Sequence, residues 1–418
     1  MRYRSRDGSQ AAAAPATVVG ERLAARRHWG LEAPGRQGKP AMKPQARKPA
    51  RHSSSIQWPG CASEADLPSR RSFVLSVGST PEVRPAVTME FSQAGLLAGL
   101  GLALALCCTV SLFIGYASIP VASALSGLVG GEGVEGIIMQ DIRLPRMLLG
   151  VVAGAALGMS GAALQGLLRN PLAEPGVMGI ASFASLGAVI AIYFGISTLF
   201  ELSLPIAAMT GALLAAAILN LISARHNSLY TLVLAGVALA NLAAALMALA
   251  LNLAPNPYAV SEIVYWLLGS LKDRSTQDVL LAVPFVALGM FILHGTRRAL
   301  DALALGEDVA RSMAIDVTRT GQLVTLGVAL TVGASVAVTG AIAFVGLIVP
   351  HLCRSLVGHE PSRLLWPSAI GGALLVSIAD IAVRLVPSGP ELMLGVFTSL
   401  IGVPFFLWLV FRLRQEAT

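Results

Sequence analysis

Side chains that could bind a metal gather in one short stretch of the sequence. His351, Cys353, His359 and Glu360 fall within ten residues. The two histidines lie on either side of an expected helix end followed by Gly358, so they would not share one face. No pair of cysteines in the chain has CxxC or similar ligand spacing. The sequence therefore predicts neither a metal site nor a disulfide framework.

Phosphate-binding chemistry is also missing from the main part of the chain. A Walker A loop needs Gly-Lys-Ser/Thr after a glycine-rich turn, but the one lysine after Met89 is Lys272, in the sequence SLKDR. Any ATP and magnesium chemistry would therefore belong to a partner protein. The chain is predicted to have no catalytic residue, to bind no cofactor and not to be an enzyme.

A charged segment near residue 310 has a regular apolar pattern. Leu305, Val309 and Met313 recur at four-residue steps, which would place them on one face of a short amphipathic helix. Glu307 and Arg311 have the spacing of an (i, i+4) ion pair. From the pattern alone, a solvated loop that anchors the topology is the stronger interpretation.

Three arginines stand at the ends of apolar stretches. Arg143 and Arg146 flank a Leu-Pro pair, and Arg384 lies near the end of a later stretch. By chemistry alone Arg143 and Arg146 would be anchors whose long side chains reach the lipid headgroups. Asp380 precedes Arg384 by one helical turn and can pair with it, which lowers the cost of placing either charge in a membrane.

Several polar side chains lie inside the apolar stretches. Most are expected to join helices by hydrogen bonds, and a few could line a pathway. They are Gln165, Asn220, Asn241, Asn252, Thr331, Ser335 and Thr339.

The composition indicates the class of protein in which these residues lie. The chain has 418 residues, of which 55% are hydrophobic and 13% charged, against about 25% charged in an ordinary globular domain. A soluble protein of this size could not cover its surface with so few charges. The composition indicates a polytopic membrane protein and argues against a cytosolic enzyme, a nucleic-acid-binding module and a secreted disulfide-rich domain.

The net charge of +7 belongs to the first part of the chain. Residues 1–88 hold 15 of the 30 basic and 6 of the 23 acidic residues. They are rich in Ala, Pro, Arg and Ser and contain no apolar stretch long enough for a signal peptide or a span. Two interpretations stay open: a disordered basic leader, or a misassigned start with Met89 as the true first residue. The remaining part, 89–418, would be the transmembrane domain.

Apolar stretches of about 20 residues, the length of one membrane-spanning helix, recur along this domain. The expected spans are 95–117, 147–168, 177–195, 203–222, 230–254, 279–295, 321–352, 365–387 and 393–411. The seventh is too long for one upright helix and is predicted to break near Gly340. Ten helices result, with both chain ends on the side that collects most arginines, the inside.

Six motifs in order carry a resemblance to a known family. They are RLPRMLLGVVAGAALGMSGAALQGLLRNPLAEPGVMGI from Arg143, LVLAGVALANLAAALMAL from Leu232, YWLLGSL from Tyr265, ALGEDVARSMAID from Ala304, GAIAFVGLIVPHLCRSLVG from Gly340 and PELMLGVFTSLIGVPFFLWL from Pro390. Together they resemble the permeases of type II ABC importers, which take up ferric siderophores, haem and cobalamin. The resemblance covers about residues 92–414.

The resemblance implies an all-α membrane bundle of about ten helices with the type II permease fold, in the cell inner membrane, with both termini cytoplasmic. It also implies a second permease subunit, in a homodimer or a pseudodimer of two different chains, with the homodimer favoured. Two ATPase subunits, which carry ATP and magnesium, and a periplasmic or surface-anchored binding protein would complete the complex. Membrane lipid surrounds such a protein, and nucleic acid is not an expected partner.

The resemblance further implies roles for particular residues. GEDVAR matches the segment, about 297–320, that docks on the ATPase, which implicates Leu305, Gly306, Glu307, Val309 and Arg311. Arg143 and Arg146 of RLPR, together with Arg384, would face acidic residues of the binding protein, because a guanidinium suits bidentate carboxylate pairing. Asn241 and Asn252 match the helix that lines the pathway, and Gln165 is a further candidate for it.

Two other functions compete with this one. An ion-coupled secondary transporter would place an ionisable residue or a broken helix pair near the membrane midplane. The one internal acid with a clear position is Asp380, which Arg384 already matches. A structural membrane scaffold is disfavoured by the coupling-like segment. Among cargoes, a ferric siderophore is favoured because such systems dominate the family, with haem and cobalamin as the alternatives.

Overall fold

The computed structural model describes residues 92–416 apart from 116, 118, 131–132, 201, 227 and 387–390. This described part of the chain is all-helical and contains no strand, which confirms the predicted fold class. The predicted leader or misassigned start, residues 1–88, lies outside the described residues.

Eight helices among the described residues are long and apolar enough to cross a membrane, and α5 and α13 are two shorter apolar helices. The ten helices together are α1 (Gln93–Phe113), α4 (Leu144–Leu168), α5 (Ile180–Tyr193), α6 (Ser203–His226), α7 (Leu229–Asn252), α9 (Thr276–Gly295), α12 (Val317–Thr339), α13 (Val345–Arg354), α14 (Pro361–Leu385) and α15 (Leu394–Glu416).

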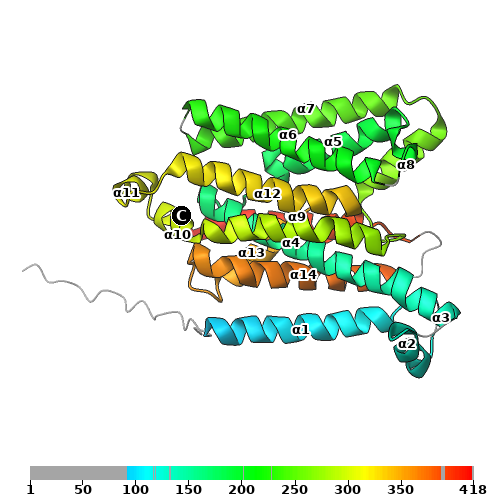
Figure 1. Ribbon diagram of the computed structural model, residues 1–418. Coiled ribbons are helices and arrows are strands. Elements are labelled where there is room, and N and C mark those ends of the chain that lie inside the picture. Colours follow the sequence, from blue (N-terminus) through cyan, green and yellow to red (C-terminus); the bar gives the residue numbers. More distant parts are fainter. Residues whose placement is uncertain are drawn as a thin grey trace, which may run out of the picture. The chain divides into compact units, whose positions relative to one another are not determined.

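Short helices lie at the two ends of the bundle (Figure 1). One end carries α2 (Val121–Leu128), α3 (Val134–Ile137) and α8 (Pro257–Leu268), and we call it the α2 end. The opposite end carries α10 (Arg297–Ala304) and α11 (Glu307–Ser312), and we call it the α11 end.

Local sequence signals start several of these helices. Asn256 accepts a hydrogen bond from the backbone N of Ala259 and Pro257 follows it, so α8 has both an N-cap and a first-turn proline. At α9, Ser275 and Asp278 cap each other's backbone N–H groups in a capping box. Such caps satisfy donors that the first turn of a helix leaves unpaired.

The chain breaks between α12 and α13, as predicted. Gly340 ends α12 with a φ of +70°, and a Cβ atom there would lie 2.3 Å from the carbonyl oxygen of Trp266. Glycine therefore fits this position both by conformation and by space. After the break, α13 has 10 residues, about 15 Å of helix, so it crosses half of the membrane thickness.

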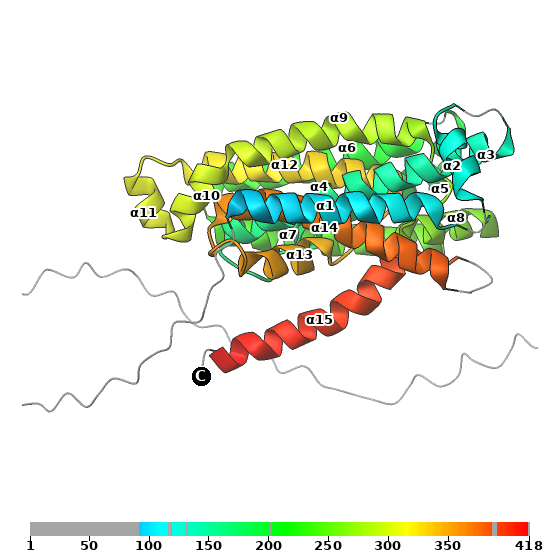
Figure 2. The same cartoon turned by 90° about the horizontal axis from the view of Figure 1, so that it is seen from below.

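Helix α4 lies at the centre of the bundle and packs on α14, α13, α12 and α9 (Figures 1 and 2). Its glycines allow the neighbouring backbones to touch. A Cβ on Gly158 would lie 2.0 Å from the carbonyl oxygen of Ser368, and one on Gly161 would lie 2.0 Å from that of Gly346. These small residues therefore permit close helix packing.

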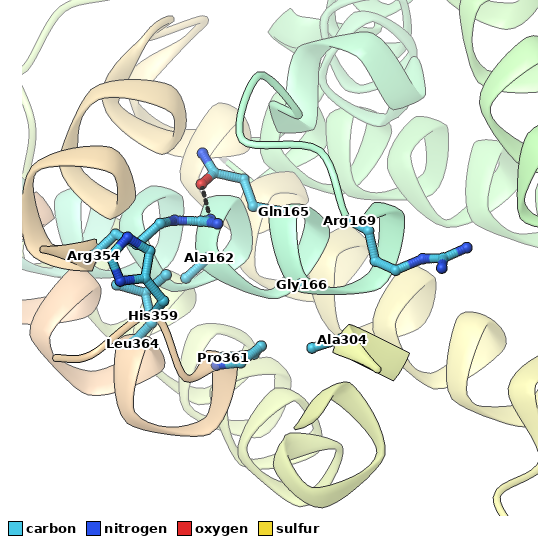
Figure 3. A pocket seen from close by; sticks show the side chains of 9 residues that line it. All are labelled: Ala162, Gln165, Gly166, Arg169, Ala304, Arg354, His359, Pro361 and Leu364. Carbon is cyan, nitrogen blue, oxygen red and sulfur yellow. Dashed lines mark hydrogen bonds between the residues drawn. The ribbon is translucent and has the colours of Figure 1, made fainter. Parts of the chain in front are cut away.

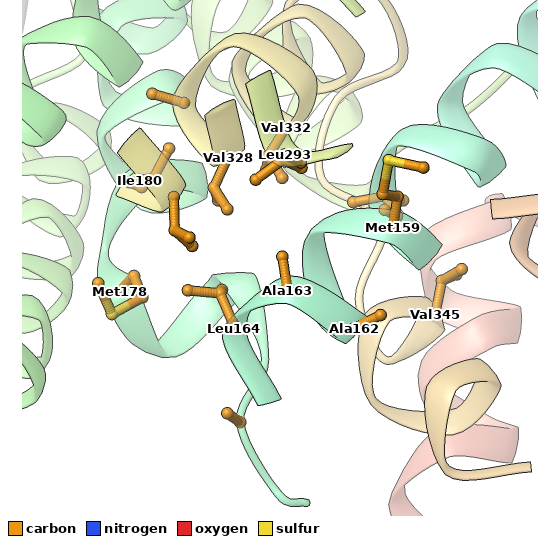
Figure 4. Packing of buried hydrophobic residues seen from close by; sticks show 14 of the residues in the cluster. Met159, Ala162, Ala163, Leu164, Met178, Ile180, Leu293, Val328, Val332 and Val345 are labelled. Atoms are coloured by element: carbon orange, nitrogen blue, oxygen red, sulfur yellow. The ribbon is translucent and has the colours of Figure 1, made fainter. Parts of the chain in front are cut away.

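Larger apolar side chains fill the remaining space around α4. Met159 and Leu164 of α4 contribute to one buried cluster with Ile180 of α5 and with Val328 and Val332 of α12 (Figure 4). These side chains expose no surface. The core therefore joins α4 and α5, in the first half of the chain, to α12 in the second half.

Helix α15 diverges from the rest of the bundle (Figure 2). It contacts α8, α13 and α14, but Leu400, Trp408 and Phe411 are left exposed along it. Within this chain, α15 therefore presents an uncovered apolar surface.

Candidate functional site

The predicted coupling segment forms the helix pair α10–α11. Gly306 joins the two helices with a φ of +119° and a ψ of 155°, a backbone conformation that strains any other residue. Beside this turn, Leu305, Val309 and Met313 leave 67%, 42% and 56% of their surfaces exposed. The apolar residues expected on one face are therefore uncovered in this chain.

Helix α10 fixes these exposed residues relative to the bundle. Its Leu300 and Leu303 are buried where α10 packs on α4 and α14. Asp301 Oδ1 also accepts a hydrogen bond of 2.8 Å from the backbone N of Ser362, in the first turn of α14. A displacement of α10 must therefore act on the start of α14.

Glu307, the first residue of α11, lies between two arginines. Its Oε2 is 3.5 Å from Nη2 of Arg311, which is the expected (i, i+4) contact, and its Oε1 is 3.6 Å from Nη2 of Arg169. Arg169, at the end of α4, was not among the predicted coupling residues, because a contact between distant segments leaves no pattern in the sequence. The three side chains are partly exposed, so each pair contributes at most about 1 kcal/mol.

Arg143 lies at the α2 end and is buried, with 5% of its surface exposed. Its Nη1 donates to the carbonyl oxygens of Leu112 and Phe113 at 2.8 and 3.3 Å, and its Nη2 donates to that of Ala117 at 2.5 Å. The side chain therefore satisfies carbonyl groups that the end of α1 leaves without helical partners.

Arg146, Asp380, Arg384 and Glu391 form a buried charge network next to Arg143. Asp380 lies 2.8 Å from Arg146 Nη2 and 2.9 Å from Arg384 Nη2, so the predicted Asp380–Arg384 pair is present. Arg146 also pairs with Glu391, which precedes α15. The network thus joins α4, α14 and the segment that leads into α15.

Arg384 extends this network to α1. Its Nη1 donates to the carbonyl oxygens of Ser111 and Ile114 at 2.9 and 2.6 Å. The structure therefore brings the three predicted docking arginines, Arg143, Arg146 and Arg384, into one cluster. Their guanidinium groups bind other groups of the same chain.

Gln165, a predicted pathway residue, is buried with 1% of its surface exposed. Its Nε2 lies 3.4 Å from the carbonyl oxygens of Ala173, Gly346 and Leu347. Its Oε1 accepts a hydrogen bond of 2.7 Å from Arg354 Nη2 (Figure 3). Gln165 therefore connects α4 to both ends of α13 and does not lie on an open surface of this chain.

Asn241 and Asn252, the other predicted pathway residues, lie exposed on α7. They are 11 residues apart, about three helical turns, so they share one face of the helix. Asn241 Nδ2 donates to the carbonyl oxygen of Val237 at 2.9 Å. The structure therefore leaves these two side chains on a surface, apart from the buried Gln165.

Glu174, in the turn between α4 and α5, is a candidate site residue that was not predicted from the sequence. Its Oε1 accepts a hydrogen bond of 2.5 Å from the backbone N of Phe344, the residue before α13. Burial raises the pKa of this carboxyl, and the hydrogen bond from Phe344 partly offsets the increase. An acid inside the otherwise apolar and proline-bounded turn PLAEP was the available signal.

The His351–Glu360 stretch does not converge on one point. The ring of His351 lies 5.8 Å from that of Phe405 on α15, and Cys353 Sγ lies 3.7 Å from the carbonyl oxygen of Pro367. Glu360 pairs with Arg363 at 2.6 Å. Among the residues that the structure describes, no three His, Cys, Asp or Glu side chains lie together as a metal site.

Comparison with known proteins gives consistent matches over most of the chain. Residues 103–412 match the FecCD transport family. The Fe(3+) dicitrate transport system permease protein FecD of Escherichia coli (strain K12) is 37% identical over 317 residues, which cover 75% of this chain and 97% of that protein. The vitamin B12 import system permease protein BtuC of Vibrio cholerae is 40% identical over 323 residues, covering 76% and 93%.

The fold has a counterpart among solved structures. A metal-chelate type ABC transporter in an inward-facing conformation superposes on this chain with a TM-score of 0.68 at 32% identity. The superposition covers 77% of this chain and 99% of the solved chain. The similarity in fold therefore extends over almost all of the solved chain.

Proposed function

Because the chain belongs to the FecCD transport family, we propose that its cargo is a ferric chelate of the siderophore type, with haem and cobalamin as alternatives. The chain is a multi-pass membrane protein and a permease subunit of an ABC importer. Relatives named for Fe(3+) dicitrate and for vitamin B12 support a large metal chelate as the class of cargo.

One observation supports ATP-driven import more than any other. The helix pair α10–α11 projects from one end of the bundle and exposes Leu305, Val309 and Met313. The sequence offers no phosphate-binding loop of its own after Met89. An exposed apolar helix face on a chain without ATPase machinery is what a separate ATPase subunit would bind.

The proposed complex contains two ATPase subunits, which hold ATP and magnesium, and a second copy of this chain. In this arrangement the α11 end and both chain termini face the cytoplasm, and the protein lies in the cell inner membrane. The pathway runs between the two copies, and Asn241 and Asn252 on the exposed face of α7 are its proposed lining. Gln165 supports that lining from within the bundle.

A periplasmic or surface-anchored binding protein would dock at the α2 end. Arg143 and Arg384 are buried, Arg146 is half-buried, and all three are bound within the chain. We therefore propose that they hold this surface in shape, and that direct pairing with an acidic partner requires them to exchange their present partners.

Uptake measurements in cells with and without the gene test the cargo. Under iron limitation, cells lacking the gene are expected to lose uptake of a labelled ferric siderophore while they keep uptake of haem and cobalamin. Loss of haem or cobalamin uptake alone would instead assign that cargo. Unchanged uptake of all three, in a strain without a second such system, would refute the proposal.

A second comparison separates ATP-driven import from ion-coupled transport. Uptake is expected to stop when cells are depleted of ATP while the membrane potential is maintained. A proton uncoupler, given to cells in which ATP is maintained, should leave the initial rate unchanged. The opposite pattern would favour an ion-coupled mechanism.

A further inference from the structure

Arg146 at the α2 end binds two carboxylates, which the chain holds in different ways. The first, Asp380, stands on α14, and its Oδ1 accepts hydrogen bonds from Nε and Nη2 of Arg146 at 2.9 and 2.8 Å. Its Oδ2 lies 2.9 Å from Nη2 of Arg384, one turn later on the same helix. Both oxygens of Asp380 are therefore engaged, and α14 fixes the position of this side chain.

Glu391 is the second carboxylate, and it is held less firmly. It lies outside any helix, in the segment that leads into α15 at Leu394, and its Oε1 pairs with Arg146. Its Oε2 is buried and has no hydrogen-bond partner. This oxygen has lost its contact with water without gaining a hydrogen bond, which weakens the interaction as a whole. Of the two acids at Arg146, Glu391 is therefore the one that can be displaced more easily.

The cluster around Arg146 has more positive than negative charge. Its guanidinium groups are those of Arg143, Arg146 and Arg384, and its carboxylates are those of Asp380 and Glu391. Arg143 donates to backbone carbonyl groups. An acidic side chain of a partner protein would therefore be attracted to this cluster. If that side chain replaces Glu391, Arg146 still binds two carboxylates, so docking leaves no buried guanidinium without a partner.

The segment that carries Glu391 leads into a helix that diverges from the bundle. Helix α15 packs on α8, α13 and α14 and then leaves the other helices (Figure 2). The ion pair between Glu391 and Arg146 ties the start of α15 to α4. Displacement of Glu391 would remove this tie, while Arg146 would keep its contact with Asp380.

We propose that Glu391 occupies Arg146 in the free permease as an internal competitor, and that an acidic side chain of the docked binding protein displaces it. The proposal rests on the proposed function, because it requires the binding protein to dock at the α2 end. It assigns different roles to the two acids. Asp380 keeps Arg146 in position, whereas Glu391 leaves and releases the start of α15.

The affinity of the permease for the binding protein tests this competition. The full-length permease, purified with its ATPase, is titrated with the cargo-free binding protein of the same transport system. Glu391→Gln removes the competing charge and keeps the size of the side chain, so it should lower the dissociation constant about tenfold. The matched control is Glu135→Gln, which removes the same charge from an exposed position on α3 at the same end. It should change the dissociation constant less than about twofold.

A second comparison shows whether the effect passes through Arg146. Arg146→Gln should weaken binding, and Glu391→Gln added to it should change nothing further, because the competitor then has no arginine to occupy. This comparison holds even where Glu391→Gln alone does not fold.

Three results would overturn the proposal. They are unchanged affinity in Glu391→Gln, equal tightening in Glu135→Gln, and tightening by Glu391→Gln when Arg146 is already replaced. Unchanged binding in Arg146→Gln would show that this arginine does not receive the partner, which also overturns it. If the natural complex does not bind the binding protein at all, the proposed function itself is contradicted, and the two failures are therefore distinguishable.

Discussion

Single side chains at the α2 end show how charges are accommodated inside this membrane protein. Asp380 lies between Arg146 and Arg384, and Arg143 binds the carbonyl groups that end α1. A charge inside a membrane is tolerated when its partners are also there. The arginines of the RLPR motif therefore have a structural function that a simple anchoring role does not describe.

The first prediction concerns Asp380. Asp380→Asn would leave Arg384 without its acidic partner and Arg146 with Glu391 alone. We expect a loss of about 3–5 kcal/mol in the free energy of unfolding, measured by thermal unfolding of the purified protein in detergent. The matched control is Glu360→Gln, which removes the exposed pair with Arg363 and should cost at most about 1 kcal/mol. Equal effects of the two variants would contradict the buried network.

The second prediction concerns the pH dependence at Glu174. Its pKa is raised in the folded state, so the folded state binds the proton more tightly than the unfolded state does. The contribution of Glu174 to the free energy of unfolding is therefore complete at pH values below the ordinary carboxyl pKa. It is lost as the pH rises through the raised pKa that the carboxyl has in the folded state. Glu174→Gln should therefore gain stability relative to the natural protein across this window, as measured by unfolding temperature between about pH 4 and pH 8.

A companion variant separates charge from hydrogen bonding at the same position. Glu174→Ala removes the acceptor of the Phe344 N–H group and should cost about 1–3 kcal/mol where the carboxyl is protonated, with the cost relative to the natural protein falling as pH rises. If Glu174→Gln is as destabilised as Glu174→Ala, the negative charge itself is required at the start of α13, and the argument from burial is wrong.

The membrane spans and the break near Gly340 could be predicted from the sequence because each leaves a continuous local pattern. A span needs about 20 apolar residues, and Gly340 ends a run too long for one helix. The charge network at the α2 end could not be predicted in full, since Arg146 contacts Asp380 across 234 residues of sequence and Arg384 contacts Ser111 across 273. The pairing of Asp380 with Arg384 was predictable because both stand on one helix.

The third prediction concerns the helix pair α10–α11. Gly306 has a φ of +119°, which proline cannot adopt, and its N–H donates to the carbonyl oxygen of Leu303 at 3.0 Å. Gly306→Pro should therefore displace α11, weaken association with the ATPase and abolish the stimulation of ATPase activity by substrate. Copurification of the two subunits and ATPase rates with and without binding protein and cargo would measure both effects.

A glycine at the same end of the bundle provides the control. Gly176 has open space around its Cα and no positive φ, so Gly176→Ala should leave assembly and stimulation intact. Full stimulation in Gly306→Pro would show that the α10–α11 turn is not needed for coupling.

The described part of the chain packs closely around α4 and leaves apolar side chains uncovered along α15. Glycines bring α4 into backbone contact with α13 and α14, whereas α15 exposes Leu400 and Phe411. Exposed apolar surface of this kind is normal toward lipid, and it also permits a second copy of the chain to pack there.

The fourth prediction concerns this assembly. The complex purified with its ATPase is expected to contain two copies of this chain and two of the ATPase, because the pathway is proposed to run between two permease subunits. Native mass spectrometry of the complex gives the stoichiometry directly. A second, different permease chain in place of the second copy would correct the homodimer, and a single permease chain per complex would contradict the proposed pathway.

The attachment of α10 to the start of α14 has a mechanical consequence. Ser362 links α14 to α10 at one end, while Asp380 links it, through Arg146, to the segment before α15 at the other. The 25 residues of α14 form a rod about 37 Å long, held against α4 by direct backbone contact. A push on α10 from an ATPase would therefore act on α14 through Ser362, and the other end of α14 would pass it through Asp380 and Arg146 to the segment before α15.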